Sequence, residues 1–236
     1  MDARGLNVWL PLDAAAFDAA CAPVAPLLRL ETLLPGARGA LVVGSAGRAF
    51  FQAFEAFPRA RDEADGARDP LDRYTRAVVE ETVRDALAPS GIAYALRFPF
   101  LGELEGASPI PFQRLGRATG LGAPGPLGLQ IHPVYGPWWA YRALVVVDAE
   151  LPAAAPVGDG CAGCDAPCVA ACPAAAVQRA GFVVPACHAR RLAVEACHLS
   201  CAARIACVRG PEHRYSDQQL AFHMTASMPR RPSGTR

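Results

Sequence analysis

Residues 161–173 read CAGCDAPCVAACP, a run of four cysteines followed directly by a proline. The spacing is C-x2-C-x3-C-x3-C-P, one residue longer than the bacterial iron–sulfur run C-x2-C-x2-C-x3-C-P. Three thiolates on one tight loop can each reach an iron of the same cube. In two-cluster proteins the fourth thiolate ligates the other cube. The run therefore predicts a [4Fe–4S] cluster.

Four further cysteines follow this run, which is the number that a second [4Fe–4S] cluster needs. If the clusters share ligands by crossover, the last cysteine completes the first cluster. The predicted ligand sets are Cys161, Cys164, Cys168 and Cys207 for one cluster and Cys172, Cys187, Cys197 and Cys201 for the other. Because eight thiolates are sufficient, His188 and His198 are expected to cover the clusters rather than ligate them.

Two other uses of the cysteines fit the sequence less well. Structural zinc prefers two CxxC pairs separated by about 15–20 residues, unlike a compact run of four. A disulfide framework is typical of secreted chains with an even cysteine count, whereas this chain has nine cysteines. Cys21 stands apart in an apolar stretch and is expected to be a buried small side chain.

The composition suits a folded protein with a substantial core. The 236 residues are 52% hydrophobic and carry a formal net charge of +1, which gives no basic footprint for nucleic acid. The N-terminus lacks the pattern of a secretion signal, and no stretch approaches about 18 uninterrupted apolar residues. We expect a cytoplasmic protein with no membrane contact, in which thiols stay reduced.

Secondary-structure signals alternate along the first 150 residues. Strands are predicted at 40–44, 92–98 and 141–147, and helices near 14–20, at 48–57 and at 70–88. The longest helix has the best start signal, with Asp69 as N-cap and Pro70 at the first helical position. Residues 100–137 are rich in Gly and Pro without periodicity, which is typical of a functional or mobile connection.

The composition changes after Leu151, which suggests a domain boundary. The predicted organisation is an α+β domain over 1–152, a two-cluster module over 153–210, a return to the first domain over 211–228, and a disordered tail over 229–236. A short helix is predicted at 217–224.

Two segments outside the cysteine run resemble the CblC-type cobalamin-processing family. LQIHPVYGPWWAYRALVVV (129–147) is similar to a family His-Pro-x-x-Gly-x-Trp-x-x-x-Arg segment, and HRYSDQQLAFHM (213–224) to a late Arg-Tyr-Ser-x-x-Gln segment. The stretches at 40–54 and 69–79 and the pair Gln113-Arg114 are also similar. The matching positions of the two main segments are His132, Pro133, Gly136, Trp138, Arg142, Arg214, Tyr215, Ser216 and Gln219.

This resemblance implies a nitroreductase-like α+β fold that binds cobalamin, with Gln113 and Arg142 beside the pocket for a thiol co-substrate. A cobalamin domain combined with a ferredoxin-like two-cluster module also resembles epoxyqueuosine reductases and reductive dehalogenases. The chain departs from these patterns in the additional residue before Cys168 and in Val208, where a proline is usual. Animal CblC members have no cysteine module.

The resemblance implies an oxidoreductase in which the clusters pass single electrons from a donor protein (a reductase, flavodoxin or ferredoxin) to a corrinoid, for upper-ligand removal or for reduction of a small substrate. Two alternatives stay open, an electron-transfer subunit without an organic cofactor and an FMN-dependent nitroreductase-like enzyme. No catalytic residue is identified; Tyr215, His132 and His223 are candidate proton donors by chemistry alone. Taken singly, Trp138, Arg142 and His132 are more readily explained as structural residues, and only their joint order indicates a site.

Overall fold

The computed structural model describes residues 4–57, 69–100, 109–122, 124–152 and 158–228. The chain divides into two compact units, the first built from 1–123 and 139–159 and the second from 124–138 and 160–236. These units do not coincide with the predicted domains. Residues 124–138 and 211–228 both group with the cysteine segment rather than with the first unit.

The first unit contains a four-stranded antiparallel sheet in the order β1-β2-β4-β3. Its strands are β1 (Val8–Asp13), β2 (Gly39–Ala46), β3 (Tyr94–Arg97) and β4 (Trp139–Val147). β4 is central, and all residues from Arg142 to Val147 are buried, as the apolar run predicts. Together with its helices, the sheet confirms the α+β class.

Strand β1 is absent from the predicted elements because its sequence, VWLPLD, contains Pro11. A proline cannot donate a ladder hydrogen bond and is tolerated at the edge of a sheet. β1 is such an edge strand, paired with β2 alone, and Pro11 lies opposite Leu41. The alternation of buried and more exposed residues along β1 is the signal that identifies it.

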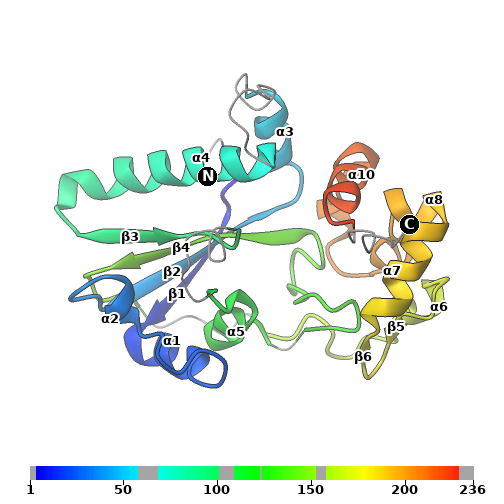
Figure 1. Ribbon diagram of the computed structural model, residues 1–236, viewed down its shortest axis with the longest axis horizontal. Coiled ribbons are helices and arrows are strands. Elements are labelled where there is room, and N and C mark those ends of the chain that lie inside the picture. Colours follow the sequence, from blue (N-terminus) through cyan, green and yellow to red (C-terminus); the bar gives the residue numbers. More distant parts are fainter. Residues whose placement is uncertain (1–3, 58–68, 101–108, 123, 153–157, 229–236) are drawn as a thin grey trace, which may run out of the picture. The chain divides into compact units, whose positions relative to one another are not determined.

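Helices cover both faces of the sheet in the first unit (Figure 1). Helix α4 (Pro70–Leu87) lies on one face, and α1 (Ala14–Cys21), α2 (Leu30–Leu33) and α5 (Phe112–Gly116) lie on the other. Helix α3 (Ala49–Glu55) follows β2. The start of α4 is as predicted, since the Asp69 side chain accepts a 2.9 Å hydrogen bond from Leu71 N. The buried face of α4 consists of Leu71, Tyr74, Thr75, Val78, Val79 and Val83.

The second unit is made of short elements. They are α6 (Pro167–Ala171), the hairpin β5 (Val177–Gln178) and β6 (Gly181–Phe182), α7 (Val184–Ala193), α8 (Glu195–Leu199), α9 (Ala202–Ile205), the turn η5 (Pro211–His213) and α10 (Asp217–Ala226). One small core joins Leu127 and Ile131 to Cys168, Val177 and Ala203. A second core joins Trp138, Tyr215 and Leu220. The segment 124–138 therefore contributes to both cores.

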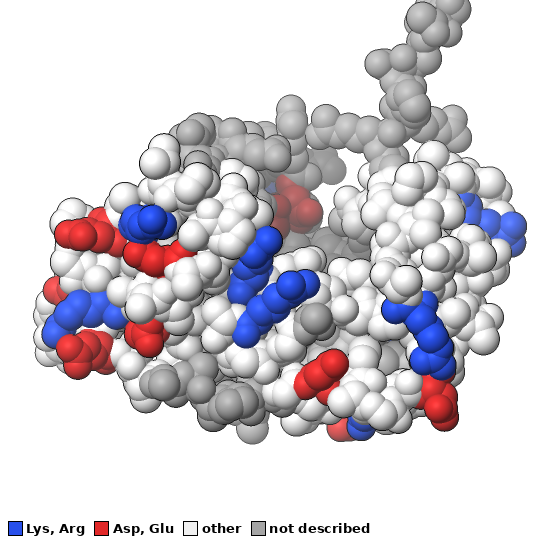
Figure 2. Space-filling model, turned by 90° about the horizontal axis from the view of Figure 1, so that it is seen from below, with Lys and Arg blue, Asp and Glu red and all other residues white. Residues whose placement is uncertain are grey.

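Over the first unit, at the left of Figure 2, Arg and acidic side chains are interspersed. Exposed ion pairs of the first unit, such as Arg76 with Glu80 at 2.7 Å, stabilise the fold only weakly. Among the described residues, no helix has both the length and the apolar character needed to cross a membrane. The predicted disordered tail, 229–236, lies outside the described residues.

Candidate iron–sulfur site

One predicted ligand set lines a single cavity in the second unit. Cys172, Cys187, Cys197 and Cys201 all lie on the wall of a cavity of about 40 Å³. They come from the end of α6, from α7, from α8 and from the residue before α9. Residues distant in the sequence thus converge, and no other cysteine lines this cavity.

Electrostatic interactions among the thiols follow the same division. Burial raises the pKa of Cys187, and its thiol neighbours Cys172, Cys197 and Cys201 raise it further, although Arg191 opposes them. Burial also raises the pKa of Cys207, where the thiol that contributes is Cys164. No thiol of the Cys161 set contributes to the pKa of Cys187, and no thiol of the Cys172 set contributes to the pKa of Cys207.

The remaining set gathers around Cys168. Burial raises the pKa of this buried thiol, and both Cys207 and Cys164 add to the increase. Cys161 packs against the same small core as Cys168 and Cys207. Cys161 Sγ also lies 2.7 Å from the position that a Cβ on Gly125 would occupy, so the loop before β4 approaches this set closely.

All nine cysteines are free thiols. Within the described part of the chain, no group of three or more His, Cys, Asp or Glu side chains is arranged to hold a single metal ion. The thiolates of a [4Fe–4S] cube each reach a different iron, so they need not converge on one ion. Cys21 is fully buried, as predicted, and burial raises its pKa to about 11. It therefore behaves as a core side chain.

The His-Pro segment forms a tight turn within the second unit. His132 and Gly136 pair as an isolated antiparallel bridge, with N–H···O distances of 3.0 and 2.8 Å. Nδ1 of His132 accepts hydrogen bonds from Val134 N and Tyr135 N at 3.0 and 3.2 Å. Burial, reinforced by His213, lowers the pKa of His132 to about 4. His132 is thus a neutral cap of this turn.

Only glycine fits the backbone conformation and the space at position 136. It has a φ of +59°, and a Cβ there would lie 2.0 Å from the carbonyl oxygen of Arg209. Arg209 in turn donates to Gly160 O at 2.9 Å and to Ala162 O at 3.0 Å, next to the first cysteine. This close approach joins the His-Pro turn to the cysteine run.

Trp138 and Tyr215, from the two family-like segments, pack together. Their ring centroids lie 5.4 Å apart at 63°, and Trp138 is fully buried. The guanidinium of Arg204 lies over both rings, 4.9 Å from Trp138 and 4.7 Å from Tyr215. Gln219 is also buried, on the first turns of α10. These side chains form an aromatic and cationic cluster in the second unit, beside α9.

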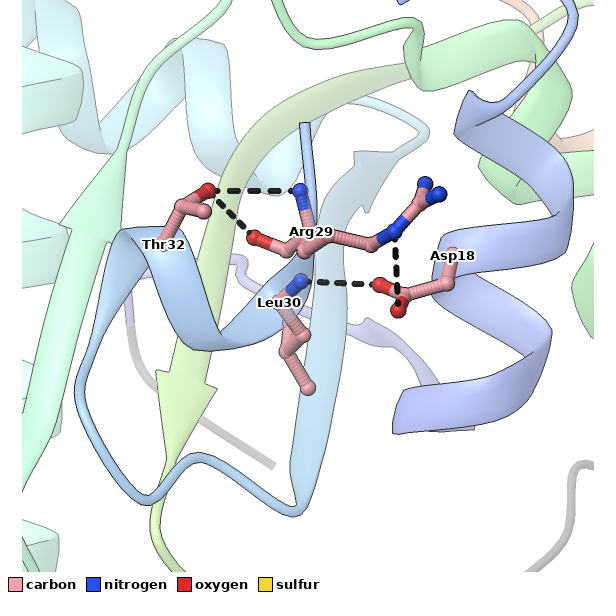
Figure 3. A network of polar contacts seen from close by, with 4 residues as sticks. All are labelled: Asp18, Arg29, Leu30 and Thr32. Carbon is pink, nitrogen blue, oxygen red and sulfur yellow. Dashed lines mark hydrogen bonds and ion pairs between the residues drawn. The ribbon is translucent and has the colours of Figure 1, made fainter. Parts of the chain in front are cut away.

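A second candidate site lies in the first unit. A cleft of about 820 Å³ is lined by residues 24–28, 99, 109–114 and 141, and includes both Gln113 and Arg114. The lining is mostly apolar, and its size is in the range of small-molecule sites. Figure 3 shows the polar contacts that fix the chain directly after the lining residues 24–28. Asp18 of α1 accepts from Leu30 N at 2.8 Å and lies 3.7 Å from Arg29, which anchors the chain after 24–28.

Arg142 belongs to the first unit, where its side chain contacts buried residues of the core. Its Nε donates to Ser45 Oγ at 2.8 Å, and its guanidinium lies 4.4 Å from the centre of the Phe50 ring. Only 8% of Arg142 is exposed, and it does not line the cleft of Gln113. His132, Pro133, Gly136, Trp138, Tyr215 and Gln219 instead belong to the second unit.

Two arginines beside the cysteines, Arg191 and Arg204, are missing from the predicted site. Arg191 is 8% exposed and lines the four-cysteine cavity, and the guanidinium of Arg204 lies over the two aromatic rings. The sequence offered a signal for Arg191: it follows the candidate ligand Cys187 by four residues, the spacing that places two side chains on one face of a helix. The α7 helix places that pair on one face.

The fold thus defines an α+β protein with a cysteine-rich second unit, and solved structures share it. No protein-family profile and no curated protein match the chain. A B12-trafficking CblC protein of C. elegans matches with a TM-score of 0.57 and 14% identity, covering 94% of this chain and 86% of that one. Epoxyqueuosine reductase from Streptococcus thermophilus matches with a TM-score of 0.55 and 12% identity, covering 88% and 63%.

Another epoxyqueuosine reductase, solved with an epoxyqueuosine-modified tRNA stem loop, matches with a TM-score of 0.55 and 12% identity over 92% of this chain. The chain spans 63% to 65% of the length of these reductases. At such identities the likeness is one of fold. The fold resemblance to both groups of proteins is therefore confirmed, whereas the cofactors and the activity stay predictions.

Proposed function

We propose that this protein is an iron–sulfur oxidoreductase whose second unit binds two [4Fe–4S] clusters and supplies single electrons to a corrinoid. The observation that carries the proposal is the convergence of Cys172, Cys187, Cys197 and Cys201 on one cavity. Only the crossover assignment groups these four residues, because Cys172 belongs by sequence to the first run. Fold likeness to a B12-trafficking protein and to epoxyqueuosine reductases adds coarse support.

The residues present fit [4Fe–4S] clusters. Thiolates are the usual ligands of these clusters, and each set supplies four. Five of these cysteines belong to or pack against one small buried core, and four line one cavity, so their surroundings would influence the reduction potential. The bound clusters would accept and release one electron at a time.

The first unit offers the space for an organic cofactor. The cleft beside Gln113 and Arg114 has an apolar lining with an amide and a guanidinium, which suits a large ring system with polar side groups. The amide and the guanidinium would bind and orient such groups, and the apolar wall would exclude water. A corrinoid is favoured over FMN by the family-like segments and by the fold likeness to a B12-trafficking protein.

The test is anaerobic reconstitution followed by titration with hydroxocobalamin. We expect about eight irons and eight sulfides per chain, and a base-off shift in the visible spectrum. The matched variant Gln113→Ala should weaken cobalamin binding without changing the iron content. Eight irons without a spectral shift would favour an electron-transfer subunit, binding of FMN in its place would favour a flavoenzyme, and zinc in place of iron would refute the proposal.

A further inference from the structure

Among the described residues, Arg191 is the one arginine that is both buried and on the wall of the four-cysteine cavity. It lies on α7, one turn after Cys187, and its neighbour Arg190 lines the same cavity but is exposed to solvent. A buried guanidinium is costly unless it is paired with negative charge or hydrogen-bonded. The surroundings of Arg191 therefore bear on what the cavity holds.

Only part of this guanidinium is satisfied by the protein. NH1 donates to Ser227 O at 3.1 Å, and NH2 donates to Met224 O and to Ser227 Oγ. These acceptors all lie at the C-terminal end of α10, so Arg191 ties that helix to α7. The buried Nε has no hydrogen-bond acceptor among the described residues. No carboxylate is paired with Arg191 in the described part of the chain.

We propose that Arg191 is the tuning residue of the second cluster, with its charge and its Nε–H directed at the sulfur ligands held by Cys172, Cys187, Cys197 and Cys201. This inference rests on the proposed function, because it requires a cluster in this cavity. A cluster with four thiolates carries net negative charge, which supplies the partner that this guanidinium lacks. Charge and hydrogen bonds to sulfur are among the main determinants of cluster potential.

The direction of the effect follows from the charge balance. One-electron reduction by a donor protein, or by dithionite in the assay, adds one negative charge to the site and requires no proton. The positive charge of Arg191 stabilises the reduced form more than the oxidised form, so it raises the reduction potential. Low dielectric around a buried charge strengthens this interaction, whereas solvent screens the charge of Arg190.

The experiment is a redox titration of the reconstituted holoprotein, monitored by electron paramagnetic resonance, for the wild type and for Arg191→Gln, Arg191→Lys and Arg190→Gln. In Arg191→Gln we expect the ratio of reduced to oxidised second cluster at a fixed potential to fall about tenfold, which is a decrease of 59 mV for a one-electron couple. The first cluster should change less than twofold. Arg190→Gln removes the same charge from an exposed position and should change neither cluster by more than twofold.

Arg191→Lys separates the two contributions, because it retains the charge but lacks the Nε–H. We expect about a threefold change in the same ratio together with altered resonance line positions for the second cluster. Should Arg191→Gln fail to take up iron, this lysine variant decides the matter, and Ser227→Ala reports the effect of loosening α10 alone. Unchanged potentials and line positions in a fully loaded Arg191 variant would overturn the inference. A wild type that binds no second cluster would instead refute the proposed function.

Discussion

Ala166 donates its backbone N–H to Sγ of Cys164 across 3.4 Å, from a left-handed conformation with φ 58° and ψ 56°. It lies in the spacer that makes the cysteine run one residue longer than the bacterial pattern. The left-handed residue redirects the chain so that α6 begins at Pro167 and Cys168 still interacts with Cys164. The additional residue is therefore accommodated locally, and the thiols of Cys164 and Cys168 still interact.

Replacing Ala166 by glycine should stabilise the protein. A left-handed conformation costs a non-glycine residue about 1–2 kcal/mol, and glycine avoids most of this cost. We expect Ala166→Gly to raise the free energy of unfolding by about 1 kcal/mol with the iron content unchanged. Ala170→Gly, in the exposed part of the adjacent helix, should lower it by about 1 kcal/mol. A loss of stability in Ala166→Gly would contradict this account.

The crossover of ligands can be tested by pairs of alanine substitutions. Each single substitution in a set should remove about four irons, the content of one cluster. Cys164→Ala combined with Cys207→Ala should cost no more than either alone, because both belong to one set. Cys172→Ala combined with Cys207→Ala should remove about eight irons. Loss of about eight irons in both double variants would mean that Cys172 ligates the same cluster as Cys164.

The neutral cap of His132 predicts a pH dependence of stability. Its pKa is lowered from 6.5 to about 4 in the folded state, so between these values the unfolded state binds more protons. Stability is therefore full above pH 6.5 and decreases as the pH falls, by about 1.4 kcal/mol per pH unit at most, until it levels off near pH 4.

Substitution of His132 by asparagine isolates this effect. The asparagine oxygen can accept from Val134 N and Tyr135 N as Nδ1 does, but it does not titrate. We expect His132→Asn to match the wild type at pH 7.5 and to lose less stability at pH 5.5, as measured by the midpoint of thermal unfolding. His132→Ala should be less stable at both pH values. Parallel pH profiles of wild type and His132→Asn would rule out His132 as the source.

Gly136 should tolerate no side chain. Alanine there combines a left-handed φ with a contact of 2.0 Å to the backbone of Arg209, so we expect a loss of about 2–4 kcal/mol in the free energy of unfolding. Gly91→Ala is the matched control, since its φ is +67° but nothing lies within 4 Å. That variant should lose only about 1 kcal/mol. Equal losses would show that the close approach to Arg209 is relaxed at little cost.

Local patterns in the sequence determined most elements of the first unit. Asp69 and Pro70 mark the start of α4 because capping and a fixed φ act on neighbouring residues. The apolar run of β4 specifies a buried central strand for a similar reason. The cysteine spacing likewise determined the candidate ligands, since metal clusters impose short-range distances on the chain.

Tertiary structure alone decided which surface the Gly- and Pro-rich segment covers. Residues 124–138 have no periodicity, yet they pack with the cysteine segment through Gly136 against Arg209 and Gly125 against Cys161. Such close approaches depend on the shapes of two surfaces distant in sequence, which no local pattern encodes. For the same reason, the family-like segment 129–147 divides between the units, with His132 in one and Arg142 in the other. The thiol spacing indicates the candidate ligands, and long-range packing decides that the buried Arg191 lies beside four of them.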